Sequence, residues 1–211
     1  LVAAIGVPRV WPLASPRRVV AYGLAALLAG VASLVLALEA GAGPEIVTVP
    51  LLLAGLGIGA LSSQLGAVTV SSVPDQLSGE VGGLQNTATN LGASLGTALA
   101  GSVLIGALSA SFLAGIADNE AVPDALSERA DVSLASGVPF VSDRQLEDGL
   151  ADAGIPQAEA QAVVDENTEA RIAGLRASLL VLSVFIMVAL FFTRLLPTRP
   201  VAGVDPARGP P

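Results

Sequence analysis

The residues of this chain best suited to chemistry are amides that lie inside a long uncharged segment. Residues 81–117 carry no charged side chain, yet Gln85, Asn86 and Asn90 lie near the start of this segment. Hydrocarbon cannot hydrogen-bond an amide, so in a membrane these groups must face protein or water. The combination predicts a membrane helix that lines a path through a protein.

The side chains of this expected helix, residues 79–112, form two neighbouring stripes at helical spacing. The first stripe combines polar and small residues, namely Gly82, Asn86, Asn90, Ala93, Thr97 and Gly101. The second contains only small residues, namely Ala88, Gly92, Gly96 and Ala100. A small-residue stripe favours close helix–helix contact. The first stripe suits either packing, with the amides bonding across helices, or one wall of a polar transport cavity to which Gln85 and Thr89 contribute.

The segment 46–74 adds a cluster of glycines and one more amide. Gly55, Gly57 and Gly59 alternate within an apolar run. Spaced glycines also occur in dinucleotide-binding loops, but no strand, helix start or distant acid accompanies them here. We therefore expect Gly55 and Gly59 to allow close helix packing or a flexible point. Gln64 lies beyond them and either faces the cavity or bonds a neighbouring helix.

The composition excludes several kinds of chemistry. The chain has no Cys and no His, which removes disulfides, thiolate metal sites and the usual proton shuttle. We find no nucleophile beside a base, no metal-ligand cluster and no phosphate loop, so we expect neither an enzyme nor a bound cofactor or metal. Asp75, Ser78 and Glu80 suit the start of a helix, as caps and as charges near its positive end. No carboxylate lies within residues 19–38, 46–74, 81–112 or 177–193, so no proton carrier is evident inside the expected membrane segments.

The overall composition is that of a membrane protein. Hydrophobic residues make up 53% of the 211 residues, charged residues only 13%, and the mean hydropathy is +0.72. Soluble domains carry about twice that share of charge. Four segments have about the length and apolar composition that a membrane helix needs, namely residues 19–38, 46–74, 79–112 and 177–196. Such runs suit helices rather than the alternating strands of a barrel, so the expected fold class is an all-α membrane protein with four transmembrane helices.

The remaining segments connect or extend these four helices. Residues 1–18 are expected to be the tail of a preceding span, an N-terminal stub, followed by an Arg-containing loop. Residues 113–176 contain 13 acidic residues and four Arg, a net charge of −9, which suits a solvated loop or a vestibule that concentrates cations. A helical face that runs on into the last span is expected there, formed by Ala160, Val164, Thr168, Ile172, Leu175 and Leu179. Residues 197–211 are rich in Pro and Gly and are expected to be disordered.

The Arg residues near the segment ends predict the orientation. Arg9, Arg17 and Arg18 precede the first complete span, and Arg194, Arg199 and Arg208 lie at or beyond the end of the last. Four spans bring both groups to one side, which the positive-inside rule makes the cytoplasm. We therefore expect a multi-pass protein of a plasma membrane, bacterial in origin, with a cytoplasmic C-terminus and an extracytoplasmic acidic segment.

Four motifs, in order, are similar to the C-terminal part of a transporter family. They are Gly55-Leu56-Gly57-Ile58-Gly59, Val73-Pro74-Asp75-Gln76-Leu77-Ser78-Gly79, Gly83-Leu84-Gln85-Asn86-Thr87 and Asn90-Leu91-Gly92-Ala93-Ser94-Leu95-Gly96-Thr97-Ala98-Leu99. The segment 45–112 resembles the 14-span drug/proton antiporters of the major facilitator superfamily, EmrB/QacA type. The likeness extends more loosely to the Arg-containing loop and to the long outer segment before the last span.

This resemblance implies that the four helices are the last four of fourteen in a major facilitator helical bundle. It implies export of drugs or other small hydrophobic molecules by proton antiport and alternating access. The candidates for lining the substrate path are then Gln64, Gln85, Asn86, Asn90 and Thr97, and those for helix packing are Gly55, Gly59, Gly92 and Gly96. The expected partners are the lipid bilayer, a small-molecule substrate, protons and the missing N-terminal helices of the same protein, but not nucleic acid.

Two other classes of membrane protein are open on the sequence alone. A non-transport scaffold or sensor subunit would use its acidic outer segment to bind a partner. A permease subunit of an ATP-driven exporter would need a coupling helix in a cytoplasmic loop, for which the 75–80 loop is short. The upstream reading frame discriminates among the three, since ten further spans would favour the exporter.

Overall fold

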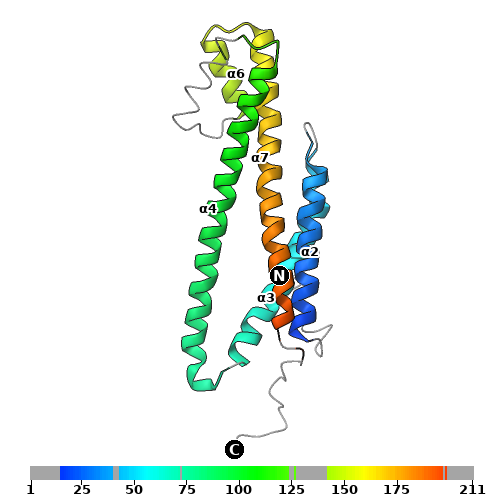
Figure 1. Cartoon of the computed structure of the whole chain (residues 1–211), viewed down its shortest axis with the longest axis vertical. Helices are drawn as coiled ribbons and strands as arrows, with labels where there is room; N and C mark the ends of the chain where they lie inside the picture. The colour runs from blue at the N-terminus through cyan, green and yellow to red at the C-terminus, as the bar shows by residue number, and fades with distance from the viewer. Residues whose placement is uncertain are drawn as a thin grey trace, which may run out of the picture. The chain divides into compact units, whose positions relative to one another are not determined.

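The computed structural model describes residues 15–39, 43–71, 73–123, 126, 142–196 and 198 (Figure 1). All regular structure in these residues is helical. The expected N-terminal stub and, apart from Thr198, the expected disordered tail lie outside the described residues, as does much of the segment between 124 and 141.

The order of elements along the chain is simple. It runs α2 (Pro16–Ala37), the 3₁₀ turn η1 (Pro44–Val47), α3 (Thr48–Ser71), the 3₁₀ turn η2 (Asp75–Leu77), α4 (Ser78–Asp118), α6 (Asp143–Asp152), α7 (Gln157–Phe192) and the 3₁₀ turn η3 (Thr193–Leu195). Four of these helices, α2, α3, α4 and α7, are long and apolar enough to cross a membrane. The expected all-helical fold with four such helices is therefore confirmed, whereas their place in a larger bundle is not tested by this structure.

The chain divides into two compact units. The first unit comprises residues 1–37, 44–96 and 182–211, and the second comprises residues 38–43 and 97–181. The divisions fall inside two continuous helices, after Gly96 in α4 and after Val181 in α7.

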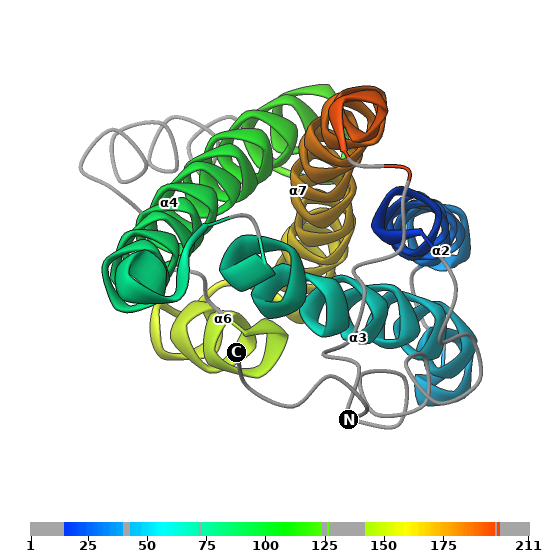
Figure 2. The same cartoon turned by 90° about the horizontal axis from the view of Figure 1, so that it is seen from below.

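Glycines bring α2 and α3 together in the first unit, where the two helices lie side by side (Figure 2). A Cβ added to Gly57 would lie 2.5 Å from the carbonyl oxygen of Gly23 and 2.7 Å from the backbone nitrogen of Leu27. A Cβ added to Gly30 would lie 2.6 Å from the backbone nitrogen of Ala54. The helices therefore meet backbone to backbone, which is the contact that small residues allow in a membrane.

The same kind of contact joins α4 to α7 in the second unit. A Cβ on Gly174 would lie 2.8 Å from the carbonyl oxygen of Leu104, and the hydroxyl of Ser178 donates a hydrogen bond of 3.1 Å to the carbonyl oxygen of Ala100. Because a hydroxyl that bonds a neighbouring helix is satisfied without water, this pairing suits a lipid environment.

The second unit also contains a folded region that we call the headpiece. It consists of residues 112–123, Leu126, α6 and residues 157–176 of α7, and its core is Ile116, Val122 and Val163. Leu146 and Leu150 of α6 pack against this core, and Figure 1 shows α6 beside the adjoining parts of α4 and α7. The headpiece therefore has a hydrophobic cluster of its own.

Local sequence signals set the start of α6. Ser142 caps the helix by accepting a hydrogen bond from the backbone of Gln145, while the Gln145 side chain accepts one from the backbone of Ser142. This reciprocal capping box satisfies two of the backbone groups that a helix start leaves unpaired. At its other end the chain turns at Gly154, whose φ of 73° favours glycine, before Pro156 introduces α7.

Gly57→Ala should destabilise the pairing of α2 with α3, whereas Gly55→Ala should not. The methyl group at Gly57 meets backbone atoms, and overpacking of this kind costs about 1–3 kcal/mol. Gly55, on the same helix, has no atom within 4 Å of the corresponding position. Both changes raise helix propensity alike, so the comparison isolates the clash. The loss of stability is measured by unfolding the detergent-solubilised protein with increasing sodium dodecyl sulfate and monitoring the helix content by circular dichroism. Equal unfolding midpoints for the two variants would contradict the contact between Gly57 and α2.

Candidate functional site

The amides that the sequence singles out lie on an exposed part of α4. Asn86 and Asn90 are exposed, Gln85 is half-buried, and Thr97 is exposed further along the same helix, within the second unit. Within the described part of the chain, neither Asn86 nor Asn90 has a hydrogen-bond partner for its side-chain amide. These two residues therefore present hydrogen-bonding groups that some other molecule or chain can engage.

The hydroxyl groups beside these amides behave differently. The side chain of Thr87 donates to the carbonyl oxygen of Gly83 at 3.0 Å, and that of Thr89 donates to the carbonyl oxygen of Gln85 at 2.9 Å. A hydroxyl can fold back in this way on the preceding turn of its own helix, which satisfies it even in hydrocarbon. An Asn amide carries two donors and an acceptor, so it needs partners beyond its own helix.

The glycines assigned to packing occupy different surroundings. Positions of a Cβ on Gly92 and Gly96 have no atom within 4 Å, and the same holds for Gly55. Gly59 is buried in α3. The close contact observed between α2 and α3 is instead made by Gly23, Gly30 and Gly57, of which the sequence draws attention only to the last, through its place in a glycine cluster.

Gln64 lies on α3, half-buried, and its amide nitrogen is 3.4 Å from the hydroxyl oxygen of Ser63. This distance is at the long end for a hydrogen bond, so the neighbour engages the amide only weakly. None of the five residues proposed to line a substrate path borders the cavity that contains Glu166 or the cavity at the start of α2. Their shared role in a path therefore stays a prediction.

A polar network stabilises the headpiece at the first turn of α6. One carboxylate oxygen of Asp143 accepts hydrogen bonds from the amide of Asn167 and from the guanidinium of Arg171, each at 2.8 Å. Asn167 and Arg171 are one turn apart on α7, and the Asn167 side chain is almost fully buried at 7% exposure. The network therefore fixes α6 against α7 in the second unit.

Two opposing effects set the pKa of Asp143. Burial disfavours the charged carboxylate and raises its pKa, but hydrogen bonds from Asn167, Arg171 and Thr168 and the positive charge of Arg171 together outweigh burial. The net pKa of Asp143 is below the ordinary value of an aspartate. The carboxylate therefore stays ionised under mildly acidic conditions.

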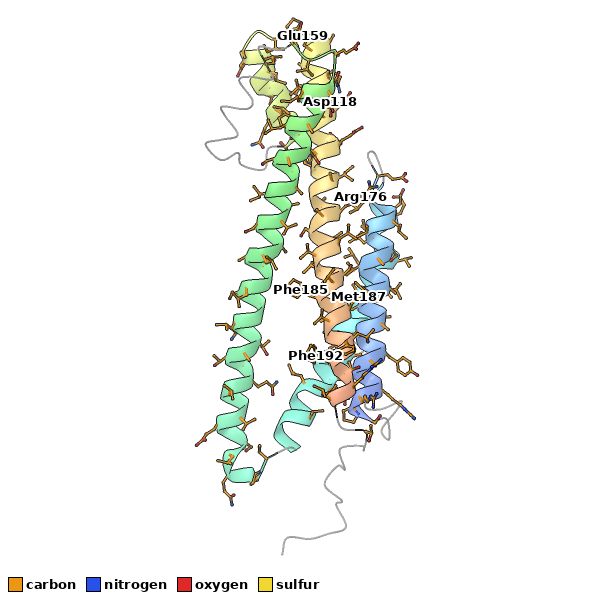
Figure 3. The ribbon with its side chains drawn as sticks, viewed as in Figure 1. Asp118, Glu159, Arg176, Phe185, Met187 and Phe192 are labelled. Carbon is orange, nitrogen blue, oxygen red and sulfur yellow. The ribbon has the colours of Figure 1, made fainter. Side chains whose placement is uncertain are left out.

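A cavity of about 430 Å³ lies within the second unit beside this network. Its charged lining residues are Glu39, Glu166, Glu169 and Arg176, and the remainder are Ser111, Gly115, Ala170, Ile172 and Ala173. The guanidinium of Arg176, which is labelled in Figure 3, donates to the carbonyl oxygen of Leu38. With three acids against one base, the cavity favours cations over anions.

Glu166 is held in this cavity by two features of α4 and the turn that follows it. The amide of Asn119 donates to one carboxylate oxygen of Glu166 at 2.8 Å. The other carboxylate oxygen occupies the space where any side chain at Gly115 would begin. Gly115 therefore gives Glu166 room, and Asn119 orients it.

The sequence predicts a helix that runs from the acidic segment into the last apolar segment, and α7 is such a helix, because it is continuous from Gln157 to Phe192. Ala160 and Val164 of the expected face are buried, whereas Leu175 is 37% exposed. Beyond Val164 the buried face of α7 runs through Asn167, Ala170, Gly174 and Ser178.

The headpiece is also the feature that sequence reasoning missed. One signal was present, because Ser142 followed three residues later by Gln145 is the pattern of a capping box. The pairing of Asp143 with Asn167 and Arg171 leaves no such local signal, since the partners lie 24 and 28 residues apart along the chain.

Comparison with protein-family models, with curated proteins and with solved structures found no match to this chain.

Asp143→Asn should lower the stability of the headpiece and flatten its dependence on pH. Because the pKa of Asp143 is lower in the folded state, its contribution is complete above the unfolded value of about 3.9 and is lost as the pH falls through the folded-state pKa. The side chain is 41% exposed, so we expect a loss of only about 1 kcal/mol at neutral pH. In acid, the variant and the wild type should have the same headpiece stability.

Hydrogen exchange of the α6 amides across this pH range measures the effect. Asp148→Asn, which removes an exposed carboxylate from the same helix, is the matched control and should retain the wild-type acid dependence. An unchanged acid dependence in the Asp143 variant would show that the network does not stabilise the headpiece.

Proposed function

We propose that this chain is part of a secondary active transporter that exports drugs or other small hydrophobic molecules. The observation that supports this most directly is the pair of exposed amides, Asn86 and Asn90, on a helix that carries no charge between Glu80 and Asp118. In a bilayer, an amide facing hydrocarbon costs several kcal/mol, so these groups belong against protein or in a water-filled path. The order of motifs between residues 45 and 112 adds the resemblance to drug/proton antiporters.

The proposed mechanism is alternating access. Two bundles of helices rock around a cavity near the middle of the membrane, and the cavity opens to one side at a time. Asn86, Asn90 and Thr97, together with Gln64 and Gln85, offer hydrogen bonds to a mostly apolar substrate. Gly92 and Gly96 permit the helix to slide against its neighbour, since they have no side chain to interlock.

Further helices of the same protein complete the bundle in this proposal. The four apolar helices would be the last four of fourteen, and the acids that carry protons would lie on the other helices, because α2, α3 and the central part of α4 hold no carboxylate. In this proposal the Arg residues at the start of α2 and just after α7 lie on the cytoplasmic side, as the positive-inside rule favours, and the headpiece lies outside a bacterial plasma membrane.

A membrane scaffold or sensor subunit is the second candidate. The observation that favours it is the headpiece, which has a hydrophobic cluster and a polar network of its own. A connecting loop needs neither, whereas a module that binds a partner needs a defined surface. The acidic cavity at Glu166 would then belong to that surface.

Dye efflux from cells that express the intact reading frame tests the two candidates. For the exporter, we expect a cell-permeant cationic dye to leave the cells, and we expect efflux to stop when a protonophore collapses the proton gradient. Efflux that continues without the gradient would reject proton coupling. Absence of efflux for a panel of unrelated dyes and drugs, at normal expression, would favour the scaffold.

Asn90→Leu should weaken resistance without lowering expression. Loss of one hydrogen bond is worth about 0.5–1.5 kcal/mol, so we expect the dye concentration for half-maximal efflux to rise about two- to tenfold. Ser102→Leu is the matched control, because Ser102 lies about 120° around α4 from Asn90 and its hydroxyl bonds the carbonyl oxygen of Ala98 at 2.8 Å. Equal efflux by both variants and the wild type, for several drugs, would exclude Asn90 from the substrate path.

A further inference from the structure

A second cavity lies at the start of α2, within the first unit. Its volume is about 490 Å³, and its described lining residues are Ser15, Arg17, Arg18, Ala21, Tyr22 and Thr198. The start of α2 lies beside η3, so the cavity joins the first turns of one helix to the chain that follows another (Figures 1 and 2). Two of these six residues are cations, three carry hydroxyl groups and none is acidic, so the cavity is suited to an anion.

The two guanidinium groups are available for such an anion. Within the described part of the chain, no carboxylate forms an ion pair with Arg17 or Arg18, whereas Arg171 is paired with Asp143. A guanidinium carries five donors in a planar fork that matches the oxygens of a phosphate. Two adjacent forks in one cavity can therefore hold a phosphate group from two directions.

The charges at the start of α2 also favour a bound anion. Helix α2 begins at Pro16, with the carbonyl oxygen of Ser15 accepting from the backbone of Arg18, and its first turn contains no acidic residue. The first turn of a helix carries positive charge from its unpaired N–H groups, so two Arg residues there repel it. An anion bound at the cavity would offset this repulsion.

The position of the cavity relative to the membrane indicates which kind of anion it binds. Residues 19–38, which follow directly, are uncharged and long enough to cross the hydrocarbon, so the two Arg lie at the level of the lipid headgroups. Tyr22 is 64% exposed and lies one turn further, about 6 Å deeper, where aromatic rings face the boundary between headgroups and acyl chains. A phospholipid would meet both features, whereas a free phosphate would meet only the Arg residues.

We propose that this cavity binds the phosphate of an anionic phospholipid, held by Arg17 and Arg18, with the glycerol and first acyl carbons along Tyr22. The site rests on the membrane placement of the apolar helices but not on transport. It would tie the start of α2 to the anionic leaflet that attracts basic residues near membrane helices.

Binding of three probes to the detergent-solubilised chain tests the proposal. The probes are phosphatidylglycerol, zwitterionic phosphatidylcholine and inorganic phosphate. Native mass spectrometry counts the bound lipids, and the shift of the thermal unfolding midpoint reports protection. We expect phosphatidylglycerol to bind and protect, and we expect the other two to do so at least about tenfold more weakly, since each lacks either the net charge or the glycerol and acyl groups.

Variants locate the site. Arg17→Gln combined with Arg18→Gln should weaken phosphatidylglycerol binding about tenfold or more. Arg17→Lys combined with Arg18→Lys keeps the charges but not the planar guanidinium donors, so its affinity should lie between those of the wild type and the Gln variant. Arg129→Gln combined with Arg144→Gln removes two charges from the outer segment and should bind as the wild type does.

Three results would overturn the proposal. They are equal binding of the two lipids by the wild type, equal protection by inorganic phosphate, and unchanged phosphatidylglycerol binding by the Gln pair at Arg17 and Arg18. If that pair fails to fold, the comparison of probes on the wild type still decides. Because none of these measurements involves efflux, failure of the exporter proposal and failure of the lipid site are separate results.

Discussion

The constraint on which this structure depends is that hydrocarbon offers no hydrogen-bond partner. Several hydroxyl groups on the long helices meet this constraint locally, since those of Ser62, Thr87 and Ser102 each bond a carbonyl oxygen one turn back. The amides of Asn86 and Asn90 have no such solution within the described chain. The same constraint thus separates polar residues that merely fit a membrane helix from those that require a partner, and this separation supports the proposed path.

Helix pairing follows from a second consequence of the same solvent. Lipid chains are as apolar as Leu, so burial of apolar side chains does not drive membrane helices together, and close backbone contact must do so. Gly23, Gly30 and Gly57 supply that contact between α2 and α3, while Gly174 and Ser178 supply it between α7 and α4. In both units the backbones approach where a side chain is missing or very small.

The sequence predicted the class of fold because that class depends on simple quantities. Length, absence of charge and apolar composition sufficed for the four long helices. The contacts between helices were harder to predict from the sequence. The glycines of α3 form an obvious cluster, but Gly23 and Gly30 occur singly among many small residues of α2, and nothing in the sequence marks them as contact sites. The headpiece was harder still, because Asp143 pairs with residues far along the chain and nothing local marks Asn167 as buried. The candidate substrate path is predicted from the spacing of its amides alone. The described contacts do not bring its five residues together, so its geometry stays a prediction.

The chemistry of the proposed path limits what it can select. Amides and hydroxyls bind through neutral hydrogen bonds, which are worth less than charged ones but need no ionised partner on the substrate. A wall of this kind, set among Gly, Ala and Leu, can accept apolar molecules of different shape, because few groups would be left unsatisfied by a poor match. A charged wall would discriminate more strongly and would hold its ligand longer. Broad export of hydrophobic compounds therefore agrees with an uncharged path, and it requires that the charges for energy coupling lie on other helices.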